Sequence, residues 1–210
     1  MLAEKLQNKI VEARFNKEID LADESIRYEQ IGNVIYLMAS PSITHERIVS
    51  QVFGQLWYYL KDKSCEVYPP TLGLDLKEFI HHVKGLESFL DFFKKKIEQD
   101  KEDQIYVYPD VSIICDDNDD HFGNHGYKKT PRMIVEVSSP GTNSHDWVWK
   151  KDLYEAIGVS EYWIVSDIQN VTVFKLKDGK YVQKDYKTEE DILEIPVSIF
   201  PDLVIRFDKR

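Results

Sequence analysis

Residues 131–151 read PRMIVEVSSPGTNSHDWVWKK, and this stretch indicates a domain that combines strands and helices. The apolar run from Met133 to Val137 is typical of a buried strand, and HDWVWKK begins a helical pattern. One residue does not fit a buried strand, because Glu136 lies in its middle. Carboxylates are rarely buried without a partner, so Glu136 either reaches water at a sheet edge or belongs to a site.

The whole chain predicts a mixed α/β (α+β) fold in a single domain over residues 1–210. Two strand-like runs around Gly32-Asn33 predict an N-terminal hairpin. A helix capped by Ser42 or Thr44 is predicted to follow. Further elements are predicted as helices in 1–24 and 145–158 and as strands in 65–76, 104–117, 131–139, 160–167, 170–186 and 203–208. Gly158 is predicted to end the helix of 145–158, and Asp178-Gly179 to form a hairpin turn within 170–186.

Residues 76–104 interrupt this pattern with an amphipathic helix. Its apolar side chains recur at helical spacing, at Phe79, Val83, Leu86, Leu90, Phe93 and Ile97. A short loop could join the strands on either side, so we interpret the helix as an insertion. It either covers the core or forms a contact with a partner or a second copy.

Composition limits the class of protein. Hydrophobic residues make up 42% of the chain and charged residues 30%, which is typical of a globular domain. No apolar run is long enough for a membrane span, and the N-terminus lacks a signal-peptide core, so we expect a cytoplasmic protein. The net charge of −10 argues against a broad basic surface. It leaves room for a local basic site or for an acidic site that needs metal ions.

Asp110 offers Glu136 a partner. It follows Pro109 at the start of another strand, so neighbouring strands would bring both carboxylates to one end of the sheet. Two close carboxylates repel each other, and a hard divalent cation removes that cost while using both as oxygen ligands. Such an ion lowers the pKa of bound water and neutralises charge on a phosphate. Lys150 and Lys151 follow in the next helix, where only one can face inward.

Several motifs resemble the Uma-type restriction endonucleases of the PD-(D/E)XK nuclease superfamily. In chain order they are YEQIGNVIYLMASPSITHERI, YPDV, IVEVSSPGT, HDWVWK and LYEAIGVSEYWIV, within residues 25–180. The resemblance implies a central mixed β-sheet flanked by helices. It also implies an endonuclease that hydrolyses DNA phosphodiester bonds with Mg²⁺, or alternatively Mn²⁺. By analogy it implies a homodimer, for which the inserted helix is one candidate contact.

The resemblance assigns roles to individual residues. Asp110 matches the aspartate of the PD motif and Glu136 the acid of the second motif, so both would hold the metal. Ser138 stands where the superfamily has its lysine. The spacing of Asp146, Lys150 and Tyr154 matches a family lysine displaced to the helix, which favours Lys150 over Lys151 as the catalytic lysine.

Two further residues match the family near the N-terminus. Glu29 matches an acidic position and could extend the metal site. His45 matches a histidine after the SPS turn and could cap the helix or orient a neighbour. Both could equally be structural.

Competing sites have weaker support. Cys115, His121 and His125 suggest zinc, but a structural zinc site usually has four ligands, and this stretch is typical of a solvated loop. Ser138 and Ser139 near His145 lack the nucleophile elbow of serine hydrolases.

The two cysteines, Cys65 and Cys115, are expected to be free buried thiols in a reducing compartment, with a disulfide as the less favoured alternative.

The alternative to an enzyme is a catalytically inactive nuclease-fold module that binds or assembles through the inserted helix. The acidic net charge favours that module. The set of Asp110, Glu136 and Lys150 favours the nuclease.

Overall fold

The computed structural model describes residues 28–31, 34–38, 40–79, 105–123, 126–138 and 149–209. The strands of this part form two mixed six-stranded sheets and a two-stranded hairpin, together with the helices α2 (Ile43–Leu60) and α5 (Lys151–Ala156). The predicted α/β (α+β) class is confirmed. Among the described residues, no helix has the length and apolar character that a membrane crossing requires.

The central sheet, sheet B, has the strand order β12-β11-β10-β9-β6-β3. Its strands β9 and β10 run parallel, and every other neighbouring pair is antiparallel. Their bounds are β3 (Glu66–Tyr68), β6 (Val111–Ile114), β9 (Met133–Val137), β10 (Glu161–Asp167), β11 (Asn170–Lys177) and β12 (Lys180–Lys187).

The second sheet, sheet A, has the order β2-β1-β5-β4-β8-β7. Its first two strands form the predicted N-terminal hairpin, in which Ile31 pairs with Val34, while Gly32-Asn33 lie outside the described residues. The bounds are β1 (Tyr28–Ile31), β2 (Val34–Leu37), β4 (Leu74–Asp75), β5 (Ile105–Val107), β7 (Phe122–Gly123) and β8 (Gly126–Tyr127).

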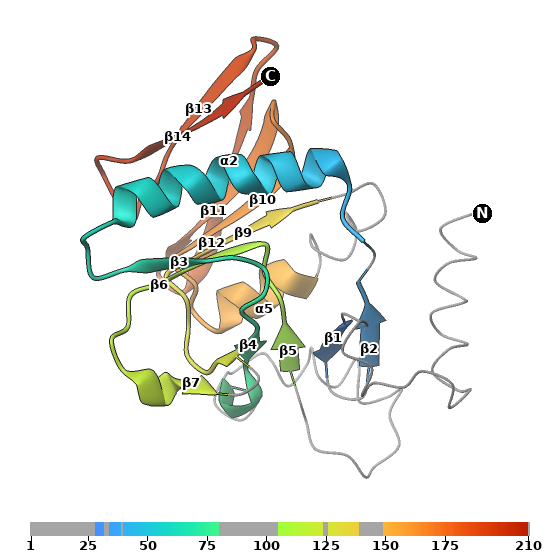
Figure 1. The fold of residues 1–210 in the computed structure, drawn as a ribbon, viewed down its shortest axis with the longest axis vertical. Coiled ribbons are helices and arrows are strands. Elements are labelled where there is room, and N and C mark those ends of the chain that lie inside the picture. Colours follow the sequence, from blue (N-terminus) through green and yellow to red (C-terminus); the bar gives the residue numbers. More distant parts are fainter. Residues whose placement is uncertain are drawn as a thin grey trace, which may run out of the picture.

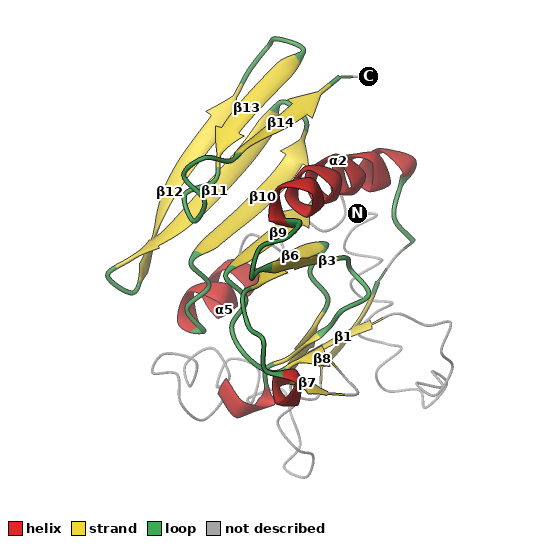
Figure 2. Ribbon diagram, turned by 60° about the vertical axis from the view of Figure 1, so that its left-hand side comes forward, coloured by secondary structure: helices red, strands yellow, loops and turns green. Residues whose placement is uncertain are grey.

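The elements pack in layers around sheet B (Figures 1 and 2). Helix α2 and the hairpin of β13 (Ile192–Pro196) and β14 (Val204–Asp208) cover one face. Helix α5 and sheet A cover the other face. Residues alternate along β9, so that Val135 points into the α2 layer and Ile134 into the α5 layer. The same alternation assigns Glu136 to the α5 layer.

Prolines carry the chain from one sheet to the other. The segment 104–117, predicted as one strand, is two strands, with β5 in sheet A and β6 in sheet B. Pro109 lies between them, and proline has no N–H to donate to a strand ladder. Pro69 and Pro70 similarly separate β3 of sheet B from β4 of sheet A. Asp110 therefore enters sheet B at the point where the two sheets meet.

The predicted helix ends and turns are borne out where they are described. Ser42 caps α2, and its side chain accepts a hydrogen bond from the His45 amide at 3.1 Å. Gly158, with φ of 85°, ends the α5 segment. Asp178 and Gly179 have φ of 52° and 77°, as the two-residue turn between β11 and β12 requires.

The inserted helix is described only at its start. Residues 77–79 form a 3-10 helix, η1 (Lys77–Phe79), rather than α-helix. The remainder of the predicted insertion, residues 80–104, and the helices predicted in 1–24 lie outside the described residues.

Helix α2 also covers the edge of the C-terminal hairpin. The Gln55 side chain donates to the Arg206 carbonyl at 2.8 Å and accepts from the Arg206 amide at 2.9 Å. Gln51, one turn earlier, makes the same pair of bonds to Asp208, each at 3.1 Å. Two glutamines thus satisfy backbone groups of β14 that a neighbouring strand would otherwise pair with.

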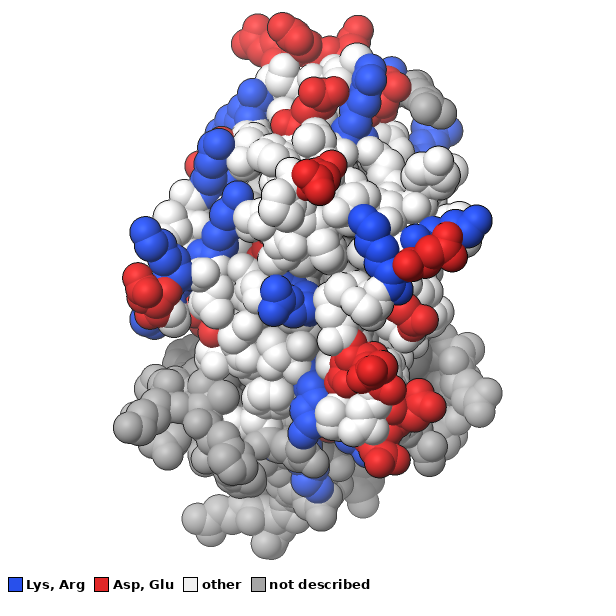
Figure 3. All heavy atoms as spheres, turned by 90° about the vertical axis from the view of Figure 1, so that its left-hand side faces the viewer, with Lys and Arg blue, Asp and Glu red and all other residues white. Residues whose placement is uncertain are grey.

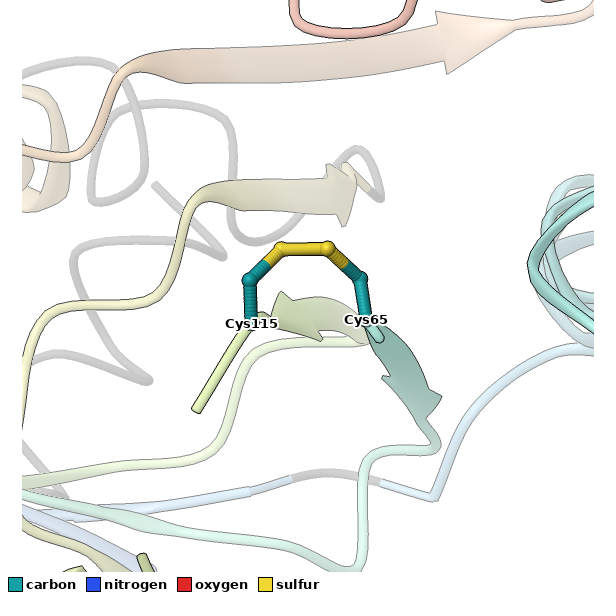
Figure 4. Close-up of a disulfide and its surroundings, with 2 residues drawn as sticks. All are labelled: Cys65 and Cys115. Carbon is teal, nitrogen blue, oxygen red and sulfur yellow. A yellow bond between two sulfur atoms is a disulfide. The ribbon is translucent and has the colours of Figure 1, made fainter. Parts of the chain in front are cut away.

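The expectation of free buried thiols is wrong, because Cys65 and Cys115 form a disulfide with a Cα–Cα distance of 4.0 Å (Figure 4). The register of β3 and β6 explains the bond: Glu66 lies opposite Ile114, so the cysteines next to them lie opposite each other. Cys115 is exposed and Cys65 half-buried. Sequence spacing alone could not show this register.

We predict that reducing this disulfide destabilises the protein. The cysteines are 50 residues apart, and opening a loop of that length costs roughly 4 kcal/mol in the chain-entropy account. Urea unfolding with and without reductant measures the difference. A double Cys65→Ser/Cys115→Ser variant should match the reduced protein and ignore the reductant. Two free thiols in the unreduced, unfolded protein would contradict the disulfide.

Glu161 predicts a second stability effect. This carboxylate is fully buried and accepts hydrogen bonds from Trp163 Nε1 at 2.7 Å, the Ser198 amide at 2.7 Å and the Ile199 amide at 3.2 Å. Glu161→Gln places an amide among these donors and should lower the free energy of unfolding by about 1–3 kcal/mol. Glu194→Gln, at an exposed position of β13, is the control in urea unfolding. Equal unfolding midpoints for the two variants would show that Glu161 does not stabilise the segment of Ser198 and Ile199.

Candidate active site

Asp110 directly precedes β6, and Glu136 lies in β9, the strand that pairs with β6 in sheet B. In the antiparallel pair of β6 and β9, Val111 lies opposite Val135, and one further step places Asp110 opposite Glu136. Such opposed residues have Cα atoms about 4.5–5.5 Å apart. Asp110 Oδ2 also accepts a hydrogen bond from the Val137 amide at 2.7 Å, which fixes the aspartate against β9.

Lys150 lies between two carboxylates. Its Nζ is 2.9 Å from Glu136 Oε1 and 2.9 Å from Glu29 Oε1, and each of the three residues is 4% exposed. Residues 149–150 form a π-helical turn directly before α5, and such turns are frequent at functional sites. The neighbouring Lys151 instead pairs with Asp152 at the surface. Of the two lysines, Lys150 is therefore the one that reaches the acids.

Tyr154 is a member of the cluster that the sequence did not single out for a role. Its hydroxyl donates to Glu136 Oε1 at 2.9 Å, and its side chain is fully buried. Burial, reinforced by the nearby Glu136, raises the pKa of Tyr154 well above its usual value, so the hydroxyl stays a donor. The sequence could have indicated that Tyr154 joins the cluster, because it lies one helical turn after Lys150 and the two side chains share a face.

Glu29 connects sheet A to this cluster. It lies in β1, and besides Lys150 its Oε1 accepts a hydrogen bond from the Tyr108 amide at 3.0 Å. Tyr108 precedes Pro109 and Asp110, so Glu29 also holds the segment that delivers Asp110. The contacts of Glu29 are therefore to the lysine and to the backbone.

His45 contacts the cluster from the first turn of α2. Its Nε2 is 3.1 Å from Asp110 Oδ2, and this bond raises the pKa of His45 above its ordinary value against the opposing effect of burial. Two groups, the His45 ring and the Val137 amide, bind Asp110 at Oδ2. In the described part of the chain no hydrogen bond to Asp110 Oδ1 is found.

Ser138 completes the face of β9 that carries Glu136. Its amide donates to the Val165 carbonyl at 2.9 Å, and the residue is 8% exposed. Its buried hydroxyl has no hydrogen-bond partner among the described residues.

The charges of the cluster suit a cation. Three buried carboxylates, those of Glu29, Asp110 and Glu136, lie with one buried lysine, Lys150, and one half-buried histidine, His45. Within the described residues no group of three or more His, Cys, Asp or Glu side chains forms a ready-made metal site. Mg²⁺ is commonly held by one or two carboxylates together with waters and substrate phosphates. Asp110 and Glu136 fit that requirement, and the excess negative charge favours it.

The competing sites do not gain support. Cys115 is in the disulfide, and His125 lies outside the described residues. His121 Nδ1 lies 2.5 Å from Asp116 Oδ2, which also accepts from the Tyr127 hydroxyl at 2.8 Å. The hydrogen bond to His121 is the largest cause that lowers the pKa of Asp116. Ser139 and His145 lie outside the described residues.

Comparisons with known proteins agree with this architecture. The family described as "Uma2: Putative restriction endonuclease" matches residues 15–207. A crystal structure of "a putative nuclease belonging to DUF820" from Anabaena variabilis ATCC 29413 superposes with a TM-score of 0.58 and 16% identity, over 89% of this chain and 88% of that chain. At this identity the likeness shows the fold alone. No curated protein matches the chain.

Lys150→Met should destabilise the protein strongly, because it leaves Glu29 and Glu136 buried without their shared cation. The expected loss is about 3–5 kcal/mol, measured by urea unfolding in the presence of a chelator. Lys151→Met is the matched control, since its ion pair with Asp152 is exposed and should contribute at most about 1 kcal/mol. Similar losses in the two variants would show that the buried bridge is not a structural link.

Proposed function

The chain belongs to the Uma2 family, and from this premise we propose that it is a metal-dependent endonuclease that hydrolyses phosphodiester bonds in DNA. The observation that supports the proposal is that Asp110 bonds to the Val137 amide while Glu136, the residue before Val137, bonds to Lys150. Asp110, Glu136 and Lys150 come from three separate segments of the chain, and each is buried. We propose that all three act as catalytic residues.

Asp110 and Glu136 are the proposed ligands of Mg²⁺, with Mn²⁺ as an alternative. A bound divalent cation supplies a more acidic water and neutralises charge on the phosphate that is attacked. The two carboxylates lie on neighbouring strands, so one ion can use an oxygen from each. The Val137 amide holds Asp110 in place for this role.

Lys150 is proposed to orient the attacking water or to stabilise charge on a phosphate oxygen. In the hydrolysis, a water oxygen bonds to phosphorus as the bond from phosphorus to the leaving oxygen breaks. One water proton ends on the leaving oxygen and the other is released to solvent or a base. The products are one strand end with a phosphate and one with a hydroxyl.

Glu29 and His45 are proposed as supporting residues. Glu29 contacts Lys150 and the Tyr108 amide, which supports a role in placing the lysine rather than as a ligand of the ion. His45 contacts Asp110, which supports a role in orienting that carboxylate. Ser138, whose buried hydroxyl has no hydrogen-bond partner among the described residues, is proposed as a third supporting residue.

The surface charge bears on how DNA would bind. The net charge is −10, and the face in Figure 3 has basic and acidic side chains interspersed around a broad uncharged area. The described part of that face carries no continuous basic band, and from the acidic net charge we expect few, local contacts with phosphates. The measured affinity for DNA should then fall only modestly as salt rises.

Assembly and location are also proposals. A homodimer would cut both strands of a duplex, and the insertion at 76–104 is the candidate contact, although residues 80–104 lie outside the described part of the chain. A cytoplasmic location stays a prediction. The Cys65–Cys115 bond is of a kind that is rare in reducing compartments.

A second candidate function is a nuclease-fold module without activity that binds or assembles with a partner. The acidic net charge favours it, because nucleic-acid binding normally requires a basic footprint. Absence of cleavage of any DNA or RNA by the wild-type chain, with Mg²⁺ or Mn²⁺, would favour this module over the enzyme.

We predict that the wild-type chain converts supercoiled plasmid to nicked or linear DNA with Mg²⁺ or Mn²⁺, and that a chelator stops it. Asp110→Asn removes a ligand charge and should lower the rate at least about 100-fold. Asp202→Asn, at an exposed position outside the cluster, should cleave at the wild-type rate. Equal rates for Asp110→Asn and wild type would overturn the site assignment.

A further inference from the structure

We propose that Tyr154 is a positioning residue whose hydroxyl holds the Glu136 carboxylate in place while Lys150 turns from that carboxylate toward the substrate. The inference rests on the proposed function, because it assigns Glu136 as a ligand of the divalent ion. It adds a residue that contacts neither the ion nor the substrate.

The geometry begins with one oxygen that has two donors. Lys150 Nζ and the Tyr154 hydroxyl each lie 2.9 Å from Glu136 Oε1. Lys150 and Tyr154 are four residues apart, about one helical turn, so both approach the carboxylate from the same side. Two donors on Oε1 fix the rotation of the carboxylate about its Cγ–Cδ bond. They thereby fix where the second oxygen, Oε2, lies.

The two donors differ in their freedom to move. The side chain of Lys150 has a flexible stem. Its Nζ also lies 2.9 Å from a second carboxylate oxygen, Glu29 Oε1. Its ammonium group can therefore leave Glu136 without losing every anionic partner. A lysine that acts on the attacking water or a phosphate oxygen must make such an exchange.

Tyr154 has no comparable freedom. Its side chain is fully buried, and its ring meets the Tyr162 ring edge-on at 5.0 Å between centroids. Tyr162 in turn stacks on Phe174 at 5.7 Å. This row of packed rings keeps the hydroxyl where it is. When Lys150 turns toward the substrate, the Tyr154 hydroxyl still holds Oε1, and Glu136 keeps its orientation toward the ion.

The test measures Mn²⁺ binding to the full chain without DNA, by the loss of the free-ion signal in electron paramagnetic resonance. Tyr154→Phe keeps the ring and removes the hydroxyl, and it should raise the dissociation constant for Mn²⁺ about 10–100-fold. Replacement by para-aminophenylalanine restores an N–H donor at the same place and should recover most of the affinity. In cleavage assays the rate of Tyr154→Phe should recover at high Mn²⁺, with KM for DNA unchanged.

Tyr181→Phe is the matched control. It also removes a tyrosine hydroxyl from the same row of rings, since Tyr181 packs on Phe174 at 5.7 Å between centroids, but that hydroxyl donates to the Val159 carbonyl at 3.0 Å and not to Glu136. Its dissociation constant for Mn²⁺ should stay within about twofold of wild type, since it leaves the second shell of Glu136 intact.

Other results for Mn²⁺ binding would overturn either the role of Tyr154 or the proposed function. If wild type binds Mn²⁺ and Tyr154→Phe binds it equally well, the role of Tyr154 is wrong and the proposed function stands. If wild type binds no Mn²⁺, both the proposed function and this inference fail. A Tyr154→Phe chain that does not fold, judged by circular dichroism, would assign the hydroxyl to stability and overturn its positioning role.

Discussion

One buried ammonium group, that of Lys150, joins an acidic residue of sheet A to an acidic residue of sheet B. Lys150 lies between Glu29 of sheet A and Glu136 of sheet B, and all three side chains are almost completely buried. Burial removes the water that would otherwise stabilise the two carboxylates, and the shared ammonium group offsets that loss. The way in which β1, β9 and the start of α5 meet follows from this one interaction.

The same junction explains how a site can form from segments far apart in the sequence. The chain crosses from sheet A to sheet B at Pro109, and Asp110 is the first residue after the crossing. Its carboxylate is fixed by the Val137 amide on one side and His45 on the other. A cluster with three carboxylates, one lysine and one histidine carries excess negative charge. Such an imbalance is costly to the fold and is what a divalent cation corrects, so it fits a site kept for function.

Much of this could be predicted where the physics is local. Glu136 stood out because a strand puts alternate residues on one face, and an acid on a buried face needs a partner. Ser42 and the Asp178-Gly179 turn follow from capping and from φ values that few residues adopt. The features that were missed depend on register. The Cys65–Cys115 bond needs the pairing of β3 with β6, and the division of 104–117 between two sheets needs the packing of the whole chain. The spacing of Tyr154 from Lys150 is visible in the sequence, but no sequence pattern shows which oxygen a hydroxyl reaches.

The proposed nuclease site requires Asp110 and Glu136 to hold one divalent cation together. The most direct measurement is anomalous diffraction at the manganese edge from crystals soaked in Mn²⁺. The account predicts one peak with oxygens of both Asp110 and Glu136 within about 2.0–2.5 Å, with Tyr154 still bonded to Glu136. A peak elsewhere in a chain that cleaves DNA, or no peak between these two carboxylates at saturating Mn²⁺, would contradict it.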